Sequence, residues 1–356
     1  MGVQKPLTTI AVITMAVLGF ALAGCDIGRP LTPGGTPAPS LQAPPEVPGS
    51  GLQEVPPAPE TERPDPRAFV HRFMRCRLLE PFGDRAYAML TERGKQAFIN
   101  GSDPTLGGAP VMQRMTGYSL EDVAGGSGSW TATVSIRLTG PADKAESMFY
   151  RERLTIVPRG GGFAVDNWEP GSPTQAYAAR GWTTLCLKDA AGKERTVMTS
   201  GQIPVPFTPQ GDNPQQTITS AGEFKCVALF SDGQVAFATL GLFGSTVGVA
   251  AEGQKAQVLA RYEGGVNELV WAPRGRLLAV EGQLPSGKTD IVIYDVAADR
   301  PVLTVSEVVP EKQGNLTRGC WLADDRCFYF FTAATGEPPK LWELDLDTGR
   351  ARPAEV

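Results

Sequence analysis

The chain has 356 residues, a formal net charge of −5, 41 glycines and 31 prolines. This length exceeds what one hydrophobic core usually serves, so two folded units plus non-globular segments are expected. The glycine and proline content excludes a compact helical protein, and the acidic balance argues against a nucleic-acid partner.

The N-terminus has the features of an export signal. Lys5 precedes an apolar stretch, Thr9 to Ala21, which is too short to span a bilayer but suits a signal-peptide core. The following Leu22-Ala23-Gly24-Cys25 resembles the lipobox of bacterial lipoproteins. The resemblance implies that residues 1–24 are a signal peptide, that Cys25 carries palmitate-type acyl chains, and that the mature protein is held extracytoplasmically on the cell membrane.

Residues 25–66 form the next segment. Asp26 resembles the signal that retains lipoproteins on the outer face of the inner membrane in Gram-negative cells. Twelve prolines lie between residues 26 and 66, without apolar periodicity. Such a sequence cannot bury a core, and it predicts a semi-extended tether between the membrane and the folded part.

Residues 67–170 predict helices followed by a sheet. Asp65 and Pro66 are a helix cap and a first-turn proline, and apolar residues recur at helical spacing as far as Leu78. Further helical turns are expected over 85–90 and 92–99. Alternating strands are expected over 130–138, 148–157 and 163–168, with a turn at Gly160-Gly161-Gly162.

This α+β order, together with Phe163-Ala164-Val165-Asp166-Asn167-Trp168, resembles the cone-shaped fold named after nuclear transport factor two. In that family the mouth of the cone can hold a small ligand or an active site. The resemblance implies that the candidate pocket rim is Tyr150, Arg151, Glu152 and Asp166. The alternative interpretation is that these are ordinary solvated strand residues.

Residues 178–356 contain internal repeats of a strand, a turn and a strand. Four such segments are predicted, over 183–199, 246–262, 289–305 and 340–356. Three of them follow another hairpin, over 227–238, 269–280 and 320–331. The aligned Phe230, Trp271 and Trp321 are spaced as in four-stranded propeller blades.

The stretch 270–279, with Trp271 before Ala272-Pro273-Arg274-Gly275, resembles TolB-like propeller repeats. The chain departs from the family pattern at Ala272 and Arg274. Four outer hairpins and three inner ones amount to three and a half blades. The predicted fold class is therefore mainly β, an α+β cone followed by a small or incomplete β-propeller whose first blade is completed by a neighbouring segment, by a second subunit or by nothing.

One motif matches a nucleotide-binding pattern. Residues 282–289 read G-x-x-x-x-G-K-T after an apolar strand. That motif needs a following helix to hold phosphate, whereas residues 290–296 alternate as a strand. We therefore expect a hairpin turn and no nucleotide.

The remaining reactive residues nominate no catalytic centre. Spacing permits disulfides between Cys320 and Cys327 and between Cys186 and Cys226, against the alternative of small buried apolar residues. The lone His71 has no evident catalytic partner and is expected at a solvent-facing or rim position. Cys76 is expected in the core.

No cofactor or metal is predicted. The Asp345–Gly349 turn resembles a calcium loop only superficially, because it lacks the further acidic ligands.

These features predict a membrane-tethered extracytoplasmic lipoprotein that acts as a binding or scaffolding module. Its partners would be the membrane, through the N-terminal lipid, and an envelope protein or a cell-wall component. The alternative is an extracytoplasmic enzyme or small-ligand receptor that uses the cone pocket.

Overall fold

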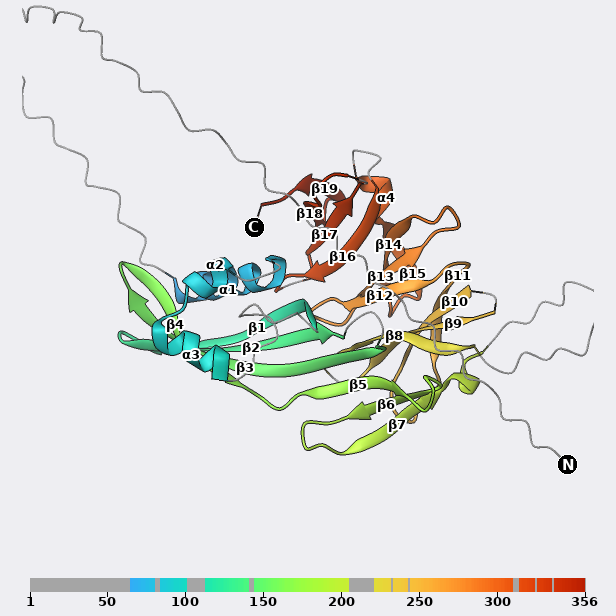
Figure 1. Ribbon diagram of the computed structural model, residues 1–356, viewed down its shortest axis with the longest axis horizontal. Helices are drawn as coiled ribbons and strands as arrows, with labels where there is room; N and C mark the ends of the chain where they lie inside the picture. Colours follow the sequence, from blue (N-terminus) through green and yellow to red (C-terminus); the bar gives the residue numbers. More distant parts are fainter. Residues whose placement is uncertain are drawn as a thin grey trace, which may run out of the picture. The chain divides into compact units, whose positions relative to one another are not determined.

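The computed structural model describes most of the chain beyond the predicted tether. The described residues are 65–80, 84–100, 113–140, 144–204, 221–309 and 314–355, apart from 232, 243, 324 and 335. They all belong to one unit, Thr61–Val356, which consists mostly of β-strands (Figure 1). The predictions for the signal peptide, the lipidated Cys25 and nearly all of the tether lie outside the described residues.

Three helices begin the described chain: α1 (Pro66–Leu79), α2 (Asp84–Ala88) and α3 (Glu92–Asn100). The Asp65 side chain accepts a hydrogen bond of 2.8 Å from the Arg67 amide, which caps α1. The predicted helices are confirmed. Among the described residues, no helix is long and apolar enough to cross a membrane.

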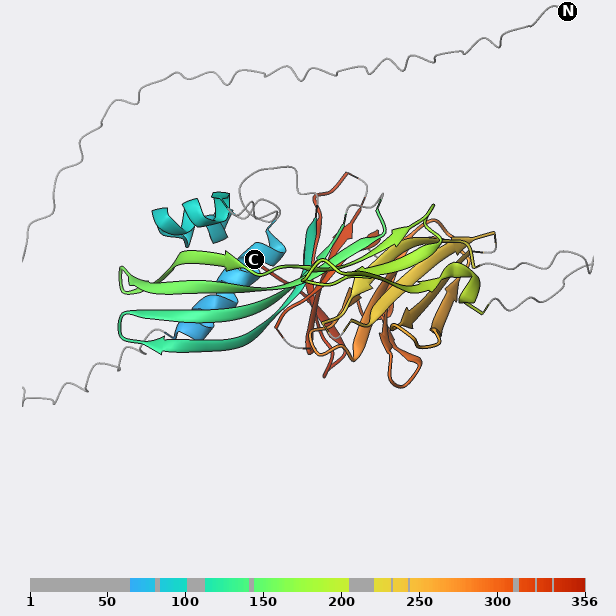
Figure 2. The ribbon, with the colours of Figure 1, turned by 90° about the horizontal axis from the view of Figure 1, so that it is seen from below.

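Four antiparallel strands follow: β1 (Arg114–Gly126), β2 (Ser129–Thr139), β3 (Glu146–Arg159) and β4 (Gly162–Pro170). The predicted β2, β3 and β4 are confirmed, while β1 was not expected from the sequence. Gly160 and Gly161 turn β3 into β4 with φ angles of 55° and 79°. Apolar side chains of the helices and of these strands share one core, and Figures 1 and 2 show α1 along the long strands.

Most of the remaining described residues form strands that pair antiparallel with their neighbours. Two separate four-stranded sheets are β8 (Glu223–Leu229), β9 (Val235–Gly241), β10 (Gly244–Ala250) and β11 (Gln257–Tyr262), then β12 (Val266–Trp271), β13 (Leu277–Gln283), β14 (Thr289–Asp295) and β15 (Arg300–Thr304). The last four strands are β16 (Asn315–Trp321), β17 (Cys327–Ala333), β18 (Lys340–Asp345) and β19 (Arg350–Pro353), which follow the short helix α4 (Val305–Val308). All the predicted repeat hairpins in this part are confirmed.

The repeated aromatic position connects successive sheets. The indole Nε1 of Trp271 donates to the carbonyl of Ala228 on β8, and that of Trp321 donates to the carbonyl of Val270 on β12, at 3.0 Å and 3.2 Å. Both tryptophans are fully buried. At Trp271 and Trp321, the sequence period therefore marks a residue that fixes its strand to the preceding sheet.

The remaining strands β5 (Thr174–Ala179), β6 (Thr184–Lys188) and β7 (Glu194–Thr199) lie before the 3-10 turn Ser200–Gln202. Strand β5 pairs with the start of β3, with Glu146 opposite Tyr177. A neighbouring segment thus extends the β6–β7 hairpin, which is one of the three outcomes that the sequence left open. At the other end, β1 pairs in parallel with β16 at Gly117 and Trp321, so one 11-stranded sheet contains both the earliest and the latest strands.

The phosphate-loop-like motif is a hairpin turn, as expected. The amide of Leu284 donates to the Lys288 carbonyl at 2.8 Å, and Gly287 has a φ angle of 80°. Strand β14 begins directly at Thr289, so the motif lacks the helix that phosphate binding requires.

Candidate functional site

The four candidate rim residues do not converge on one site. The carboxylate of Glu152 is fully buried, forms an ion pair with Arg77 of α1 and accepts a 2.8 Å bond from the indole of Trp168. Tyr150, two residues earlier on the same face of β3, is 8% exposed and belongs to the core. These two side chains therefore lie inside the N-terminal core.

The other two candidates lie elsewhere. Arg151 is exposed and binds Glu121 of β1 at 2.8 Å. Asp166 accepts a 2.8 Å bond from the hydroxyl of Thr91 and lies 3.3 Å from Arg93. Because neighbouring residues of a strand point to opposite faces, Arg151 is separated from Tyr150 and Glu152.

Neither predicted disulfide pair is formed. No disulfide joins any of the described cysteines Cys76, Cys186, Cys226, Cys320 and Cys327. Cys320 lies opposite Tyr329 rather than Cys327, because the register of β16 on β17 pairs Trp321 with Phe328. Cys226 is buried, and its thiol donates to the Val266 carbonyl at 3.6 Å.

Two minor candidates have local explanations. Nδ1 of His71 lies 3.2 Å from the hydroxyl of Tyr118. One oxygen of Asp345 accepts from the amides of Asp347 and Thr348, which is an ordinary turn arrangement. The described part of the chain contains no group of three or more residues that could hold a metal ion.

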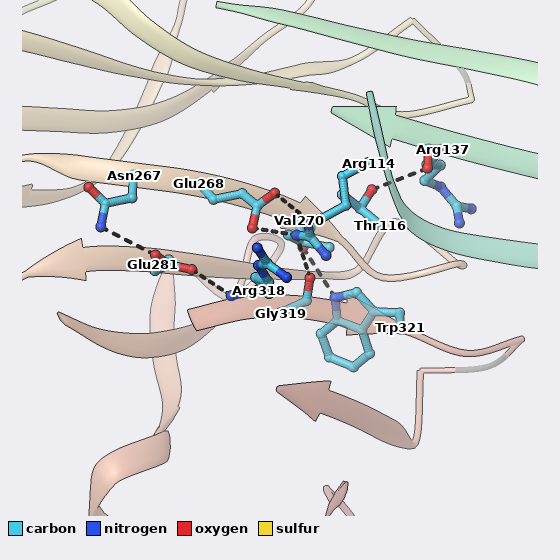
Figure 3. A network of polar contacts seen from close by, with 10 residues as sticks. All are labelled: Arg114, Thr116, Arg137, Asn267, Glu268, Val270, Glu281, Arg318, Gly319 and Trp321. Carbon is cyan, nitrogen blue, oxygen red and sulfur yellow. Dashed lines mark hydrogen bonds and ion pairs between the residues drawn. The ribbon is translucent and has the colours of Figure 1, made fainter. Parts of the chain in front are cut away.

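A polar network that the sequence did not predict lies where β1 meets the C-terminal sheets (Figure 3). Glu268 of β12 and Glu281 of β13 are directly opposite each other across the strand pair. Arg114 of β1 binds both oxygens of Glu268 and donates to the Gly319 carbonyl at 2.9 Å. Although burial opposes the charged form, Glu268 raises the pKa of the Arg114 guanidinium.

Glu281 occupies the more enclosed position in this network. Its two oxygens accept from the Asn267 side chain at 3.2 Å and from the Arg318 amide at 2.9 Å. Burial, and then repulsion from Glu268, raises the pKa of Glu281 to about 7. Arg318 has a φ angle of 56° at an irregularity of β16, so a strained backbone position presents this amide.

Two carboxylates with such different environments resemble an acid–base pair. However, Glu281 is only 9% exposed and the Glu268 side chain only 13% exposed. The groups that bind these two carboxylates belong to β1, to β16 and to β12 itself. The arrangement fixes β1 against β12, β13 and β16 and leaves little access for a substrate.

A second arginine reaches this junction from β2. Arg137 is 3% exposed, donates to the Pro273 carbonyl at 2.8 Å and lies over the Phe230 ring. Burial lowers the pKa of its guanidinium to about 10. Arg114 and Arg137 thus place two guanidinium groups at this junction, one bound to Glu268 and the other to a backbone carbonyl.

An accessible candidate is the pocket of about 530 Å³ on the outward face of β3, β5, β6 and β7. We call it the Trp182 pocket. The residues that line it are Lys144, Ala145, Glu146, Gln175, Tyr177, Ala178, Trp182, Lys188 and Glu194. The strand register places most of the polar members in two neighbouring rows, which explains why residues distant in sequence meet here.

Trp182 stands on a strained loop between β5 and β6. Arg180, Gly181 and Trp182 have φ angles of 52°, 67° and 65°, a conformation that is costly for residues other than glycine. The carbonyl of Trp182 accepts a 2.8 Å bond from the Phe224 amide. The loop keeps the indole 39% exposed, with the ammonium of Lys225 4.3 Å from the centre of its ring.

Comparisons with known proteins do not assign the chain to a family. No family model matches the chain, and no curated protein matches it. Solved structures similar to it include TolB from Acinetobacter baumannii, which belongs to a β-propeller family. The identity is 9% and the TM-score 0.37, and the match covers 68% of this chain and 69% of that one.

Another is a puromycin-hydrolyzing peptidase from Mycobacterium tuberculosis, at 14% identity and a TM-score of 0.32, covering 69% of this chain and 38% of that one. Because both TM-scores are low, neither likeness supports a conclusion about the fold or the function of this chain.

Proposed function

We propose that the protein is a lipid-anchored extracytoplasmic binding module that holds its ligand in the Trp182 pocket. The observation that carries the proposal is the strained loop that keeps a large aromatic ring exposed beside charged residues of both signs. Strain of this kind persists where the surrounding structure enforces it, and it gathers at binding and catalytic sites.

The proposed architecture is an α+β cone followed by a small propeller, with the lipid at Cys25 and residues 25–66 as a tether. The face-to-face packing of successive four-stranded sheets supports the propeller. Strands β3 and β5 would supply the inner half of its first blade. In such an arrangement the Trp182 pocket lies on an outer surface that the tether would leave accessible to envelope components.

The pocket proposal is tested by hydrogen exchange with the full-length protein in detergent. The protein is measured alone and with solubilised envelope of its own organism, and the same is done for Trp182→Ala. We expect slower amide exchange over β5–β7 in the wild type only. Unchanged exchange there, or equal protection of the variant, would overturn the proposal. Exposed Leu242, on another hairpin, provides the matched control Leu242→Ala.

The lipid anchor has a separate test. Cells expressing the wild type and Cys25→Ser are grown with a clickable palmitate analogue, and the membrane fraction is probed for the protein. We expect label and membrane retention in the wild type and neither in the variant. Equal labelling of the two proteins would exclude Cys25 as the anchor.

A small-ligand receptor in the proposed cone, residues 67–170, is the second candidate function. A pocket of about 400 Å³ lies there between the start of α1 and the β3–β4 turn, lined by Asp65, Ala68, Phe69, Arg72, Gly162 and Phe163. Protection confined to these segments in the same exchange experiment would favour it.

A further inference from the structure

We propose that the ligand of the Trp182 pocket is an acidic saccharide, a sugar that carries a carboxylate or a phosphate. This inference rests on the binding function proposed above. It follows from which groups of the pocket are already occupied by contacts within the chain and which are left for a ligand.

The lysines are the available cations. The structure pairs neither Lys144 nor Lys188 with a carboxylate of any residue that it describes. Each ammonium can give up to three hydrogen bonds and a full positive charge. A ligand with an acidic group would therefore gain charge-assisted hydrogen bonds from both lysines.

The carboxylates are only partly occupied. Glu146 accepts from Gln175 at 2.9 Å and from Gln113 at 3.5 Å, and both bonds go to the same oxygen, Oε1. The other oxygen can accept a hydrogen bond from a hydroxyl group. Glu194 accepts a hydrogen bond from the hydroxyl of Tyr177. This bond, together with burial, raises the pKa of Tyr177 to about 12, so the hydroxyl stays protonated and remains a donor.

Trp182 supplies an apolar surface beside these groups. A pyranose ring presents C–H groups on one face and hydroxyls around its edge, so it can lie on an indole while its hydroxyls reach polar side chains. Lys225 lies over the indole ring and helps to hold it in place.

The charge pattern disfavours other ligand classes. A polyanion such as a nucleoside triphosphate would face the carboxylates of Glu146 and Glu194, and a cationic ligand would face Lys144 and Lys188. A neutral sugar would leave the two ammonium groups without an acidic partner. One or two acidic groups on a hydroxylated ring satisfy the lysines, Glu146 and Trp182 together.

The test is calorimetric titration of the full-length protein in detergent with four probes. They are the disaccharide of N-acetylglucosamine and N-acetylmuramic acid, N-acetylglucosamine 6-phosphate, neutral diacetylchitobiose, and lactate as an acid without a sugar ring. We expect at least one of the two acidic sugars to bind at least tenfold more tightly than chitobiose, and lactate not to bind. Comparison of the two acidic sugars distinguishes a carboxylate from a phosphate.

Variants assign the effect to the pocket. We expect Lys144→Gln with Lys188→Gln to remove the preference for the acidic sugar, and Trp182→Ala to weaken all saccharides at least tenfold. Lys255→Gln, the same charge change at an exposed lysine of the β10–β11 turn, is expected to change nothing. Circular dichroism and urea unfolding verify that each variant is folded.

The outcomes separate this inference from the function on which it rests. Equal affinity for acidic and neutral sugars, with both lost in Trp182→Ala, would refute the acidic class and leave the pocket as a binding site. Failure of every saccharide to bind, with envelope-dependent protection over β5–β7, would refute the saccharide and retain the binding module. Absence of both would overturn both proposals.

Discussion

Glu281→Gln replaces a buried carboxyl by its neutral isostere and should change how stability depends on pH. In the folded protein the pKa of Glu281 is raised from its ordinary 4.5 to about 7 by burial and by Glu268. The folded state therefore binds a proton more tightly than the unfolded chain does. The stability that this proton contributes is fully present below pH 4.5 and is lost as the pH rises through 7.

The magnitude follows from the two pKa values. Since each pH unit between them is worth about 1.4 kcal/mol, the wild type loses about 3 kcal/mol of unfolding free energy from this group between pH 4.5 and pH 8. The variant has no such loss. Its amide oxygen can accept from the Arg318 amide, and the Asn267 side chain can flip to accept from its amide nitrogen.

The assay is urea unfolding of the full-length protein, followed by tryptophan fluorescence at several pH values from 4.5 to 8. As the pH rises across this range, we expect the unfolding free energy of the variant to increase by about 3 kcal/mol relative to that of the wild type. Most of this increase should occur between pH 5 and pH 7. Glu263→Gln, an exposed carboxylate before β12, is the control and should show no such gain. A stability difference between Glu281→Gln and the wild type that stays constant with pH would refute the reasoning.

Three further predictions concern packing. Arg77→Met should lower the unfolding free energy by about 3–5 kcal/mol, because the buried Glu152 carboxylate would lose its Arg77 counter-charge. Combining it with Glu152→Leu should restore most of the loss in urea unfolding. Gly94→Ala should lower the unfolding free energy by about 1–3 kcal/mol, because the added carbon would lie 2.3 Å from a carbonyl oxygen of β4. The control Gly126→Ala adds a carbon with nothing within 4 Å and should leave the urea midpoint nearly unchanged. The Cys226 thiol, whose pKa is raised by burial and then by nearby Glu268 and Glu281, should react with Ellman's reagent only after unfolding; reaction in the native protein at the rate seen in urea would contradict its burial.

Hairpins within the C-terminal half were predictable because they are local. Apolar alternation and glycine-containing turns specify each strand pair without reference to the rest of the chain. The pairing of β1 with β16 is not local. Strand β1 also carries Gly117, Glu121 and Asp122, which obscure its alternation, so neither the strand nor its partner could be predicted.

The candidate sites show a similar division. Alternation places Tyr150 and Glu152 on one face of β3, but nothing in the sequence indicates that Arg77 on α1 would neutralise that glutamate. A usable signal for the polar network was the presence of Glu268 and Glu281 within otherwise apolar strands. For the Trp182 pocket, the signal was a tryptophan beside Gly181 in a tight turn, although the left-handed backbone of its neighbours could not be foreseen.

The parallel pairing of β1 with β16 has a consequence for the order in which the chain folds. While the chain emerges from its N-terminus, β1 is complete long before its partner exists, and the side that β16 will cover is an open edge able to pair with other chains. The residues near the C-terminus close the structure further, because the Arg75 side chain of α1 donates to the Glu355 carbonyl. The edge of β1 is thus covered only by strands far along the chain, and such non-local pairing slows folding and leaves the edge open to aggregation until β16 is in place.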